Sequence, residues 1–246
     1  MTAGIDARAG AGAAVVTGGA GGIGRAVLAR LRADGFRAVS WDLVDRVPEA
    51  DLALQVDVTD DRALADALRR TVAAAGPVRA LVINAGILGP VVPVWEVVPS
   101  EVRRVLEVNL TSAFLTSAAV VPAMLGNAGP DRGRIVVMSS LQAKEGTALA
   151  GPYAASKAGL IAMTKVLAKE LAEHGILVNA VTPTVVRTAM ERSITPARRA
   201  DLLARIPLGR FVEPAEVAEM VSWLCSSACT FSTGAVFDLS GGRATS

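Results

Sequence analysis

Tyr153 and Lys157 are the two residues whose types and spacing best fit an acid–base function. Tyr153 is the only tyrosine of the chain, and the lysine four positions later shares its face if the segment is an α-helix. A free phenol has a pKa near ~10, and a positive charge within ~4–6 Å favours the phenolate. We therefore predict that Lys157 lowers the pKa of Tyr153 for general acid–base chemistry. An exposed Tyr and Lys on an ordinary helix is the alternative, and the rest of the chain decides between the two.

A glycine-rich turn near the N-terminus has the context of a phosphate-binding site. The apolar run 13–17 predicts a buried strand, Gly18, Gly22 and Gly24 follow it, and an apolar-periodic helix begins at Ile23. Backbone N–H groups at a helix N-terminus attract anions, and glycine lets a diphosphate approach closely. A flexible loop is the alternative, but the flanking strand and helix favour nucleotide binding.

Asp42 indicates which nucleotide binds. It ends a second predicted strand, 37–42, and lies 18 residues beyond Gly24. A carboxylate at about this distance can accept hydrogen bonds from both adenosine-ribose hydroxyls and would repel a 2′-phosphate. The sequence therefore predicts NAD as cofactor in preference to NADP, with a solvated strand-end aspartate as the alternative.

Alternating strands and helices must position these groups. Apolar runs predict strands at 13–17, 37–42, 52–57, 80–84, 134–140, 176–182 and 235–239. Helices are predicted at 23–34, 60–75 and 100–125, from about 140 to 173, and at 214–226. Strands that are apolar on both faces and alternate with helices indicate a parallel sheet covered on both sides. We expect an α/β, Rossmann-type fold with a doubly wound, seven-stranded parallel sheet and its ligand at the carboxyl ends of the strands.

No internal repeat, linker or change of composition divides this series. We expect a flexible N-terminal arm at 1–12 and a single domain at 13–246. Residues 183–213 are irregular and rich in proline and arginine, which predicts a substrate lid. The arginines of this segment either attract an anionic substrate or form a solvated basic face.

Asn109 lies in the middle of the predicted helix 100–125, where asparagine is a poor helix former and needs a hydrogen-bond partner. It is either a satisfied core amide or, if it lies near the site, a residue that bends the helix and holds a water molecule.

The composition excludes several classes of partner. The net charge is +2, from 25 basic and 23 acidic residues, with no block of like charge, so neither nucleic acid nor a membrane surface is an expected partner. No uninterrupted apolar run of membrane-spanning length and no secretion signal is found, which predicts a cytoplasmic protein.

Cys225, Cys229 and the single histidine, His174, are too few for a zinc site, so no metal is expected and the cysteines are interpreted as reduced, partly buried thiols. His174 is placed at a helix end, and a serine-hydrolase triad is a poor alternative.

Taken together, these motifs resemble the short-chain dehydrogenase/reductase family over almost the whole chain, from Val15 to Gly242. The turn 17–24 matches the family's cofactor motif, 84–86 its central-strand motif, and Tyr153-x-x-x-Lys157 its catalytic pair. The family's usual spacing of 13 residues from serine to tyrosine selects Ser140 and not Ser139. Asn109 matches the asparagine of the family's catalytic tetrad.

The resemblance implies hydride transfer between a nicotinamide and a substrate carbon. Ser140 and Tyr153 would bind the substrate oxygen, and Tyr153 would exchange the proton. Lys157 would lower the pKa of Tyr153 and bind the nicotinamide ribose, and Asn109 would relay protons through a water. The implied cofactor contacts are Gly18, Gly22, Ile23, Gly24, Asp42, Asp57, Val58, Asn84, Ala85, Gly86, Tyr153, Lys157, Pro183, Val186 and Thr188.

Pro183-Thr184 stands where the family usually has Pro-Gly. A β-branched residue restricts the backbone there, so a different local turn at the base of the lid is expected.

The substrate is expected to be a secondary alcohol or ketone. The segment 144–146 and the tail 237–245 resemble, more loosely, members that oxidise 2-keto-3-deoxy sugar acids. In these, Arg243 would meet the substrate carboxylate as a bidentate partner. Gln142 is expected to face the same pocket.

Two other hypotheses remain open. A 3-oxoacyl-(acyl carrier protein) reductase would be favoured by a basic patch near Arg103 and Arg104 and by NADP, and Asp42 disfavours it. A non-catalytic NAD-binding regulatory protein would lack a catalytic group, and all four are present. Relatives are commonly tetramers, so a homotetramer built through the two long helices and the last strand is expected.

Overall fold

The computed structural model describes residues 12–188 and 195–244. Most of the predicted arm, 1–12, and the lid residues 189–194 lie outside the described residues.

Seven parallel strands form one sheet. They are β1 (Ala13–Thr17), β2 (Arg37–Asp42), β3 (Leu52–Gln55), β4 (Val78–Ile83), β5 (Gly133–Met138), β6 (Ile176–Pro183) and β7 (Val236–Leu239). The strand order is β3-β2-β1-β4-β5-β6-β7, so the chain reverses its direction of travel between β1 and β4. In open sheets of this kind the ligand binds outside the carboxyl ends of the strands at such a reversal point. The predicted doubly wound, seven-stranded sheet is confirmed.

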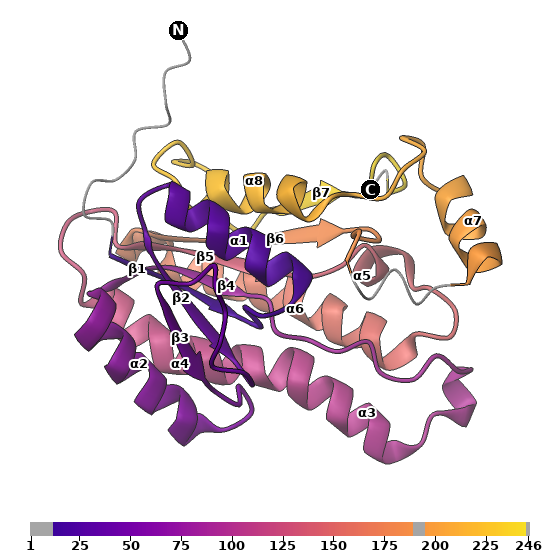
Figure 1. Ribbon diagram of the computed structural model, residues 1–246, viewed down its shortest axis with the longest axis horizontal. Helices are drawn as coiled ribbons and strands as arrows, with labels where there is room; N and C mark the ends of the chain where they lie inside the picture. Colours follow the sequence, from indigo (N-terminus) through magenta and orange to yellow (C-terminus); the bar gives the residue numbers. More distant parts are fainter. Residues whose placement is uncertain (1–11, 189–194, 245–246) are drawn as a thin grey trace, which may run out of the picture.

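Helices connect the strands and cover both faces of the sheet (Figure 1). The longer ones are α1 (Gly22–Ala33), α2 (Asp61–Ala75), α3 (Pro99–Leu106), α4 (Ser112–Leu125), α6 (Gly151–Leu171) and α8 (Pro214–Cys225). Helix α7 (Pro196–Ala204) was not predicted. The helix predicted from about 140 to 173 is divided into the four-residue α5 (Gln142–Glu145) and α6, because residues 146–150 between them are not helical.

Local signals set several of the helix ends. Asp60 caps α2, because its side chain accepts hydrogen bonds from the backbone N–H groups of Arg62 and Ala63. Pro214 opens α8, where Glu213 and Glu216 form a reciprocal capping box.

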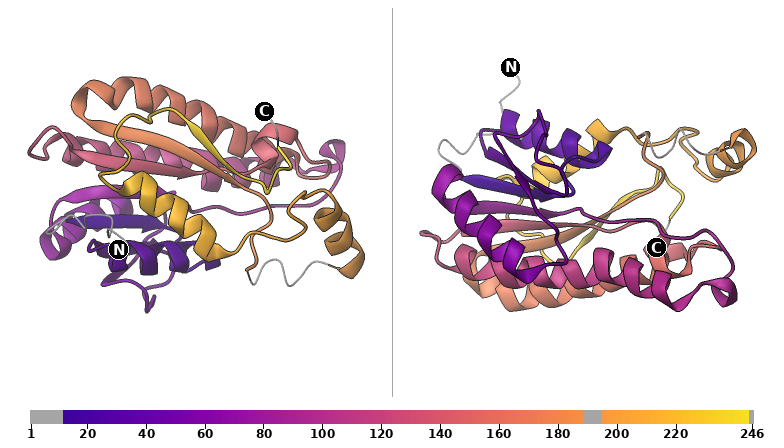
Figure 2. Two further views of the ribbon diagram at one scale, coloured as in Figure 1. Left: turned by 90° about the horizontal axis from the view of Figure 1, so that it is seen from above. Right: turned by 60° about the horizontal axis from the view of Figure 1, so that its bottom comes forward.

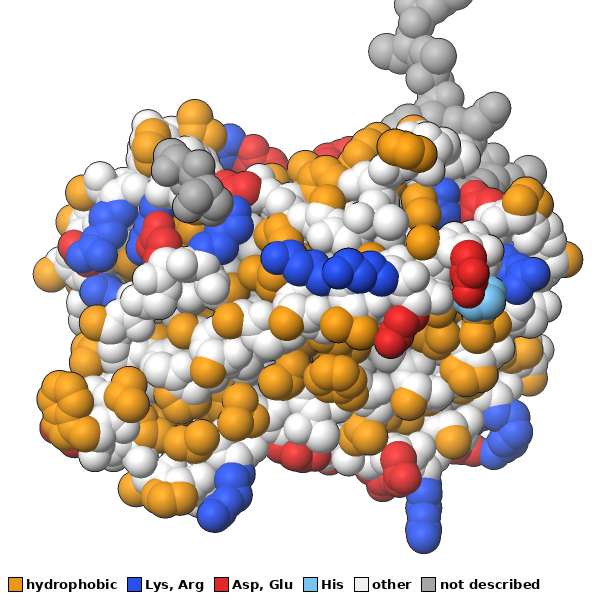
Figure 3. Space-filling model, turned by 180° about the vertical axis from the view of Figure 1, so that it is seen from behind, with side chains coloured by type: hydrophobic (Ala, Val, Ile, Leu, Met, Phe, Trp, Pro, Cys, Tyr) orange, Lys and Arg blue, Asp and Glu red, His pale blue; other side chains and the backbone are white. Residues whose placement is uncertain are grey.

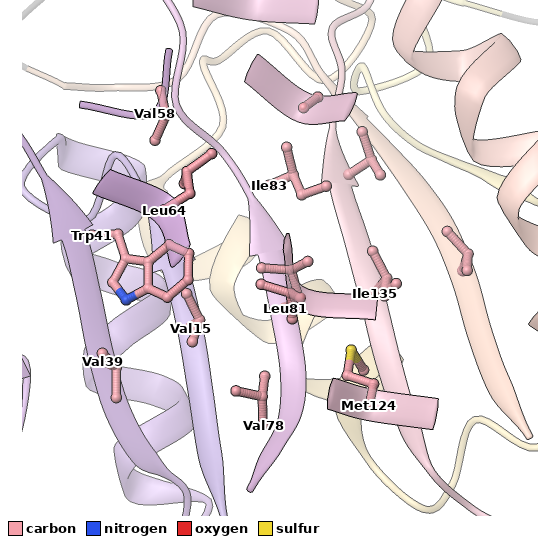
Figure 4. Packing of buried hydrophobic residues seen from close by; sticks show 14 of the residues in the cluster. Val15, Val39, Trp41, Val58, Leu64, Val78, Leu81, Ile83, Met124 and Ile135 are labelled. Carbon is pink, nitrogen blue, oxygen red and sulfur yellow. The ribbon is translucent and has the colours of Figure 1, made fainter. Parts of the chain in front are cut away.

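Two hydrophobic layers lie on opposite faces of the sheet, each under the helices that Figure 2 shows on that face. One layer joins the strands to α2, α4 and α6, and the other joins them to α1 and α8. Alternate strand residues supply the two layers: Val15 belongs to the first and Val16 to the second. Figure 4 shows Trp41 packed in the first layer, where its indole nitrogen donates to Thr71 Oγ1 at 3.0 Å.

The continuous helical stretch Pro99–Leu125 has the length and composition of a membrane-spanning helix, with a mean hydropathy of 1.5. Its buried side, however, belongs to the core of the sheet through Ala113, Val120 and Met124. The apolar character of this helix is therefore used at least in part for packing inside the protein.

Three expectations need correction. The third strand stops at Gln55, so Asp57 lies in the following turn and not in the strand. The fifth strand stops at Met138, which places both serines beyond it. The thiols of Cys225 and Cys229 are fully buried, at 0% and 1% exposure, because both pack into the layer under α8.

Candidate active site

The predicted functional residues gather at the carboxyl ends of β1, β4, β5 and β6 and at the first turns of α6. In Figure 1 these strand ends face the side on which α5 and α7 lie. A parallel sheet brings consecutive strand ends to one edge, which is why residues far apart in sequence meet there.

Lys157 is held inside the protein by the strand that precedes it. Its side chain is 4% exposed, and its Nζ donates to the carbonyl oxygen of Met138 at 2.8 Å. Nζ also lies 5.7 Å from the centre of the Tyr153 ring. Burial lowers the pKa of Lys157 to about 8, because the charged form loses its hydration.

Tyr153 lies one helical turn before Lys157. Burial raises the pKa of its phenol, and a side-chain hydrogen bond with Ser140 partly offsets that rise. The expectation that Lys157 lowers the pKa of Tyr153 is therefore not met in this structure, where burial is the larger influence and Nζ is directed to the Met138 carbonyl. The same low-polarity surroundings strengthen every hydrogen bond made to the phenol oxygen.

The structure distinguishes the two neighbouring serines. Ser139 Oγ donates to the backbone carbonyl of Lys157 at 2.8 Å, so this hydroxyl ties β5 to α6. Ser140 Oγ is the one that bonds to Tyr153, and it also accepts from the backbone N–H of Gln142 at 3.2 Å. The geometry thus supports Ser140 as the group beside the phenol and gives Ser139 a structural role.

Asn109 occupies a π-helical turn, η2 (Glu107–Thr111), between α3 and α4. Its amide accepts from the backbone N–H of Ile87 at 2.8 Å, and donates to the Ile87 carbonyl at 2.9 Å and to Ser156 Oγ at 3.0 Å. A Cβ added to Gly86 would lie 3.2 Å from Asn109 Oδ1 and 3.4 Å from Lys157 Nζ, so these groups converge. The segment after β4, the π turn and α6 are thereby fixed together. Ile87 and Ser156 were not predicted, because nothing in their spacing identifies them.

The glycine turn before α1 forms a cradle whose backbone is packed too closely to admit side chains in place of its glycines. A Cβ at Gly24 would lie 2.2 Å from the carbonyl oxygen of Gly18, and one at Gly18 would lie 2.8 Å from the Cα of Ala85. Gly18 also adopts a φ of +65°, which favours glycine. The glycines thus let the turn pack closely against itself and against the segment after β4. No side chain caps the start of α1, so its first backbone N–H groups fit the diphosphate of a dinucleotide.

Asn84 fastens the end of β4 to this turn. Its side chain donates to the carbonyl oxygens of Thr17 and Gly18, each at 3.0 Å. The backbone N–H groups of Asn84 and Ala85 both donate to Thr17 Oγ1. The central-strand motif therefore supports the phosphate cradle through hydrogen bonds to β1.

Asp42 lies at the end of β2 beside the glycine turn, where its Oδ2 accepts from the backbone N–H of Ala20 at 2.9 Å. This position fits a carboxylate that receives the adenosine ribose next to the diphosphate. Asp57 accepts from both the N–H and the hydroxyl of Thr59, and these bonds lower the pKa of its carboxyl. Val58 is buried beside it, at 8% exposure.

The segment after β6 closes the site from the other side. Val186 pairs with Val212 in an isolated bridge, and Thr188 donates its backbone N–H to the Val186 carbonyl at 2.8 Å. A Cβ added to Gly22 would meet the Thr188 methyl at 2.7 Å, so this segment lies against the glycine turn. The predicted contacts Pro183, Val186 and Thr188 are thus on a segment that reaches the cofactor cradle.

Arg243 is placed against α5. Its guanidinium binds Glu145 through Nε, at 3.1 and 3.0 Å, and through Nη2, at 2.6 Å, while Lys144 Nζ lies 3.5 Å from Asp238. The tail is thereby fixed to the helix that follows Ser140. The contact of Arg243 with a substrate carboxylate stays a prediction, and Glu145 is the carboxylate that binds it here.

A cavity of about 430 Å³ lies between the ends of β6 and β7 and the segment that precedes α8. Thr184, Leu208, Asp238 and Gly241 are among its lining residues. Thr184, which follows β6, is the lining residue that is nearest in sequence to Pro183, and the lining contains neither Ser140 nor Tyr153.

Comparisons with known proteins agree with this arrangement. A family model described as enoyl-(acyl carrier protein) reductase matches residues 18–244. The chain is 40% identical to a 2-dehydro-3-deoxy-L-rhamnonate dehydrogenase (NAD(+)) of Sphingomonas sp. (strain SKA58), over 94% of this chain and 95% of that protein. It is 34% identical to the 3-oxoacyl-[acyl-carrier-protein] reductase of Escherichia coli (strain K12), over 93% and 96% of the two chains. A crystal structure assigned to a short-chain alcohol dehydrogenase of Sinorhizobium meliloti 1021 superposes with a TM-score of 0.88 at 31% identity, covering 97% of this chain and 98% of that one.

Proposed function

The chain belongs to the short-chain dehydrogenase/reductase family, and from that premise we propose that it oxidises a secondary alcohol of a 2-dehydro-3-deoxy sugar acid. The coarser function is an NAD-dependent oxidoreductase that acts on CH–OH groups. The observation that carries the proposal is the convergence of Ser140, Tyr153 and Lys157 beside a turn that accommodates a dinucleotide.

The catalytic groups divide the work between binding and proton transfer. The hydroxyls of Ser140 and Tyr153 hold the substrate oxygen. Tyr153 first passes its own proton to the relay through Lys157, and as the phenolate it then takes the substrate proton while the C–OH group becomes C=O. NAD, when bound, supplies the acceptor for the hydride that leaves the same carbon. Lys157 holds a proton close to Tyr153 and binds the nicotinamide ribose. Asn109 fixes the helix turn through which a water relays protons outward.

The proposed cofactor-binding residues hold NAD in a fixed orientation relative to the substrate. Those we propose to hold NAD are Gly18, Gly22, Ile23, Gly24, Asp42, Asp57, Val58, Asn84, Ala85, Gly86, Tyr153, Lys157, Pro183, Val186 and Thr188. Fixing the cofactor against the substrate converts an encounter of two molecules into a reaction within one complex.

The sugar-acid assignment draws on the relative that is named for such a substrate and on basic groups near the site. Lys144 lies on α5, which follows Ser140 in the chain, and Arg243 binds α5 through Glu145. We propose that one of them meets the substrate carboxylate, and that Gln142 contacts the same molecule.

The 3-oxoacyl reductase alternative is supported by relatives of that name. The basic patch it would use is partly neutralised, because Arg104 is bound to Glu101 at 2.7 Å. Asp42 also disfavours NADP. The presence of Asn109, Ser140, Tyr153 and Lys157 close to one another favours catalysis over the non-catalytic alternative.

Residues 183–213 are proposed to form a substrate lid. Within the described part of this segment, Leu202, Ile206 and Phe211 form a small hydrophobic cluster separate from the two layers of the main core. A segment with its own small core can move with little cost to the sheet.

We also propose a cytoplasmic homotetramer that uses the outer faces of α4 and α6 and the region of β7. Figure 3 shows many uncharged side chains on the face of the molecule that α4 and α6 cover, and Phe114 and Val166 are 54% and 53% exposed. Sedimentation of the purified protein tests this assembly, and a monomer at all concentrations would exclude it.

The proposed function is tested by measuring NADH formation with 2-dehydro-3-deoxy-L-rhamnonate, secondary alcohols and 3-hydroxyacyl thioesters, each with NAD and with NADP. We expect kcat/KM to be highest for the sugar acid, and NAD to exceed NADP by more than tenfold because Asp42 repels the 2′-phosphate. In the variant Asp42→Ala this preference should fall. Preference for the thioester with NADP would establish the alternative.

A further inference from the structure

Two buried side-chain oxygens without partners lie just beyond the ends of β5 and β6. They are Oε1 of Gln142 and Oγ1 of Thr184, and neither has a hydrogen-bond partner within the part of the chain that the structure describes. Buried polar atoms are hydrogen-bonded in the great majority of cases, so an unpaired one indicates a place where another molecule supplies the bond.

The backbone holds Gln142 and Thr184 near each other, and it holds Gln142 beside Ser140. Leu141 donates its N–H to the carbonyl of Pro183 at 3.0 Å, and Gln142 and Thr184 each follow one residue after this bond. The N–H of Gln142 itself donates to Ser140 Oγ at 3.2 Å. Thr184 also lines the 430 Å³ cavity at the base of the lid, so this edge of the site has space beside it.

The chemistry of the two groups indicates what they bind. A side-chain amide and a hydroxyl are uncharged, and each can both donate and accept a hydrogen bond. The charged side chains at the neighbouring α5 form ion pairs, Lys144 with Asp238 and Glu145 with Arg243, and the basic ones are proposed above for the substrate carboxylate and not for its hydroxyl groups. The unpaired groups therefore match hydroxyl or oxo groups of a substrate and do not match an alkyl chain.

We propose that Gln142 and Thr184 form a polar subsite that hydrogen-bonds an oxygen substituent on a carbon next to the reacting carbon. The proposal deepens the proposed function and rests on it, because it explains how a polyhydroxy substrate is preferred over a simple alcohol or an acyl chain. It also assigns a substrate-binding role to Thr184, which stands where the family usually has glycine.

The expected selectivity follows from the cost of leaving these groups unpaired. A site built to bond a hydroxyl rejects an analogue that lacks it strongly, because buried polar groups then stay without partners. The wild-type enzyme should therefore favour a substrate with a neighbouring hydroxyl by at least tenfold in kcat/KM.

The test uses two alcohols that differ in one neighbouring hydroxyl, butane-2,3-diol and butan-2-ol, together with the variants Gln142→Leu and Thr184→Val. Each replacement keeps the approximate shape of the side chain and removes its hydrogen-bonding group. We expect each variant to lower the diol-to-alcohol ratio of kcat/KM at least tenfold, mainly by lowering kcat/KM for the diol, with KM for NAD unchanged.

Thr182→Val is the matched control. Thr182 lies two residues earlier on β6 and is fully buried, but its hydroxyl donates to the carbonyl of Phe237 at 3.3 Å. Thr182→Val should lower stability in chemical unfolding and leave the diol-to-alcohol ratio as in the wild type. Thr184→Val should raise stability, because it removes a hydroxyl that has no partner in the protein.

The proposal is overturned if the wild-type enzyme handles the diol no better than the alcohol, whether it oxidises both or neither. It is also overturned if Thr184→Val and Gln142→Leu leave the ratio unchanged. Failure of the proposed function is a separate result: a diol preference that the variants abolish, in an enzyme inactive on sugar acids, retains the subsite and removes only the sugar acid.

Discussion

At the scale of one residue, the fold changes the pKa of Lys157 by burying its ammonium group. Lys157 is a buried residue of α6, and its ammonium group donates a hydrogen bond to the backbone carbonyl of Met138 at the end of β5. Removal from water lowers the pKa to about 8, close to the pH at which a dehydrogenase must move protons. The lysine is thus able to hold or release a proton within the working range.

This burial predicts a pH-dependent stability. Between about pH 8 and pH 10 the lysine is largely neutral in the folded chain and protonated in the unfolded chain, so the unfolded state binds more protons. Stability should therefore rise with pH across this window, by on the order of 2–3 kcal/mol at most. Above pH 10 the buried Tyr153 acts in the opposite direction, because its raised pKa favours folding only below that range.

The measurement is chemical unfolding at pH 7 to 10 of the wild type, Lys157→Met and Lys165→Met. Lys165 is an exposed lysine two turns further along α6, so its replacement should keep the rise. Lys157→Met should abolish the rise and the activity. An equal rise in all three proteins would show that the burial of Lys157 is not its source.

At this scale the sequence predicted which candidate groups lie together better than it predicted their electrostatics. Ser140 was separated from Ser139 by spacing, and the hydrogen bonds agree. The pKa of Tyr153 could not be predicted, since it depends on burial, which spacing along a helix does not reveal. The Glu145 partner of Arg243 was also not predictable, because 98 residues separate the two.

Among the elements, the helical stretch from α3 to α4 carries the least regular feature of the site. The π turn η2 presents Asn109, whose amide makes three hydrogen bonds to the segment after β4 and to α6. An amide in a regular interior turn would lack this set of partners. The irregular turn therefore joins three elements around Lys157.

Asn109→Leu should both destabilise the protein and lower its activity. The replacement leaves the N–H and carbonyl of Ile87 without their side-chain partner, at a cost of roughly 1–3 kcal/mol. We expect a lower midpoint in chemical unfolding, and a loss of kcat at a temperature where the variant is folded, because the surroundings of Lys157 are disturbed.

Asn127→Leu is the control for this variant. Asn127 is buried and donates to the carbonyls of Val78 and Arg132, each at 2.8 Å, near the starts of β4 and β5. Its loss should destabilise by a similar amount without changing kcat. A normal kcat in Asn109→Leu would show that Asn109 contributes to the stability of the core and not to activity.

The elements themselves were predicted where hydrophobic periodicity was strong, as in β1, β5 and α2. They were missed where packing with distant segments sets the conformation. Helix α7 lies in a segment with several prolines, yet Pro196 occupies its first turn, where proline is tolerated. The division of the predicted helix 140–173 into α5 and α6 was also missed; α5 ends at Glu145, and Gly146 after it adopts the left-handed conformation.

For the whole molecule, the topology of the sheet is what converts scattered motifs into one site. The reversal of strand order between β1 and β4 places the glycine turn and the Asn84 motif side by side, and β5 and β6 continue the same edge. Fold and cofactor class could be predicted because each motif has a fixed place in this topology. The substrate could not be predicted to the same degree, because the segments that we propose to bind it, α5, the lid and the tail, depend on long-range contacts for their arrangement.

The central claim is that this scaffold uses Tyr153 to exchange a proton while NAD accepts a hydride. The most direct test is NADH formation from NAD and 2-dehydro-3-deoxy-L-rhamnonate by the wild type and by Tyr153→Phe, with NAD binding measured in both. The account predicts that the variant binds NAD and loses about 10²–10⁴-fold in kcat, the usual contribution of a general acid–base group. Equal turnover by the two proteins would contradict it.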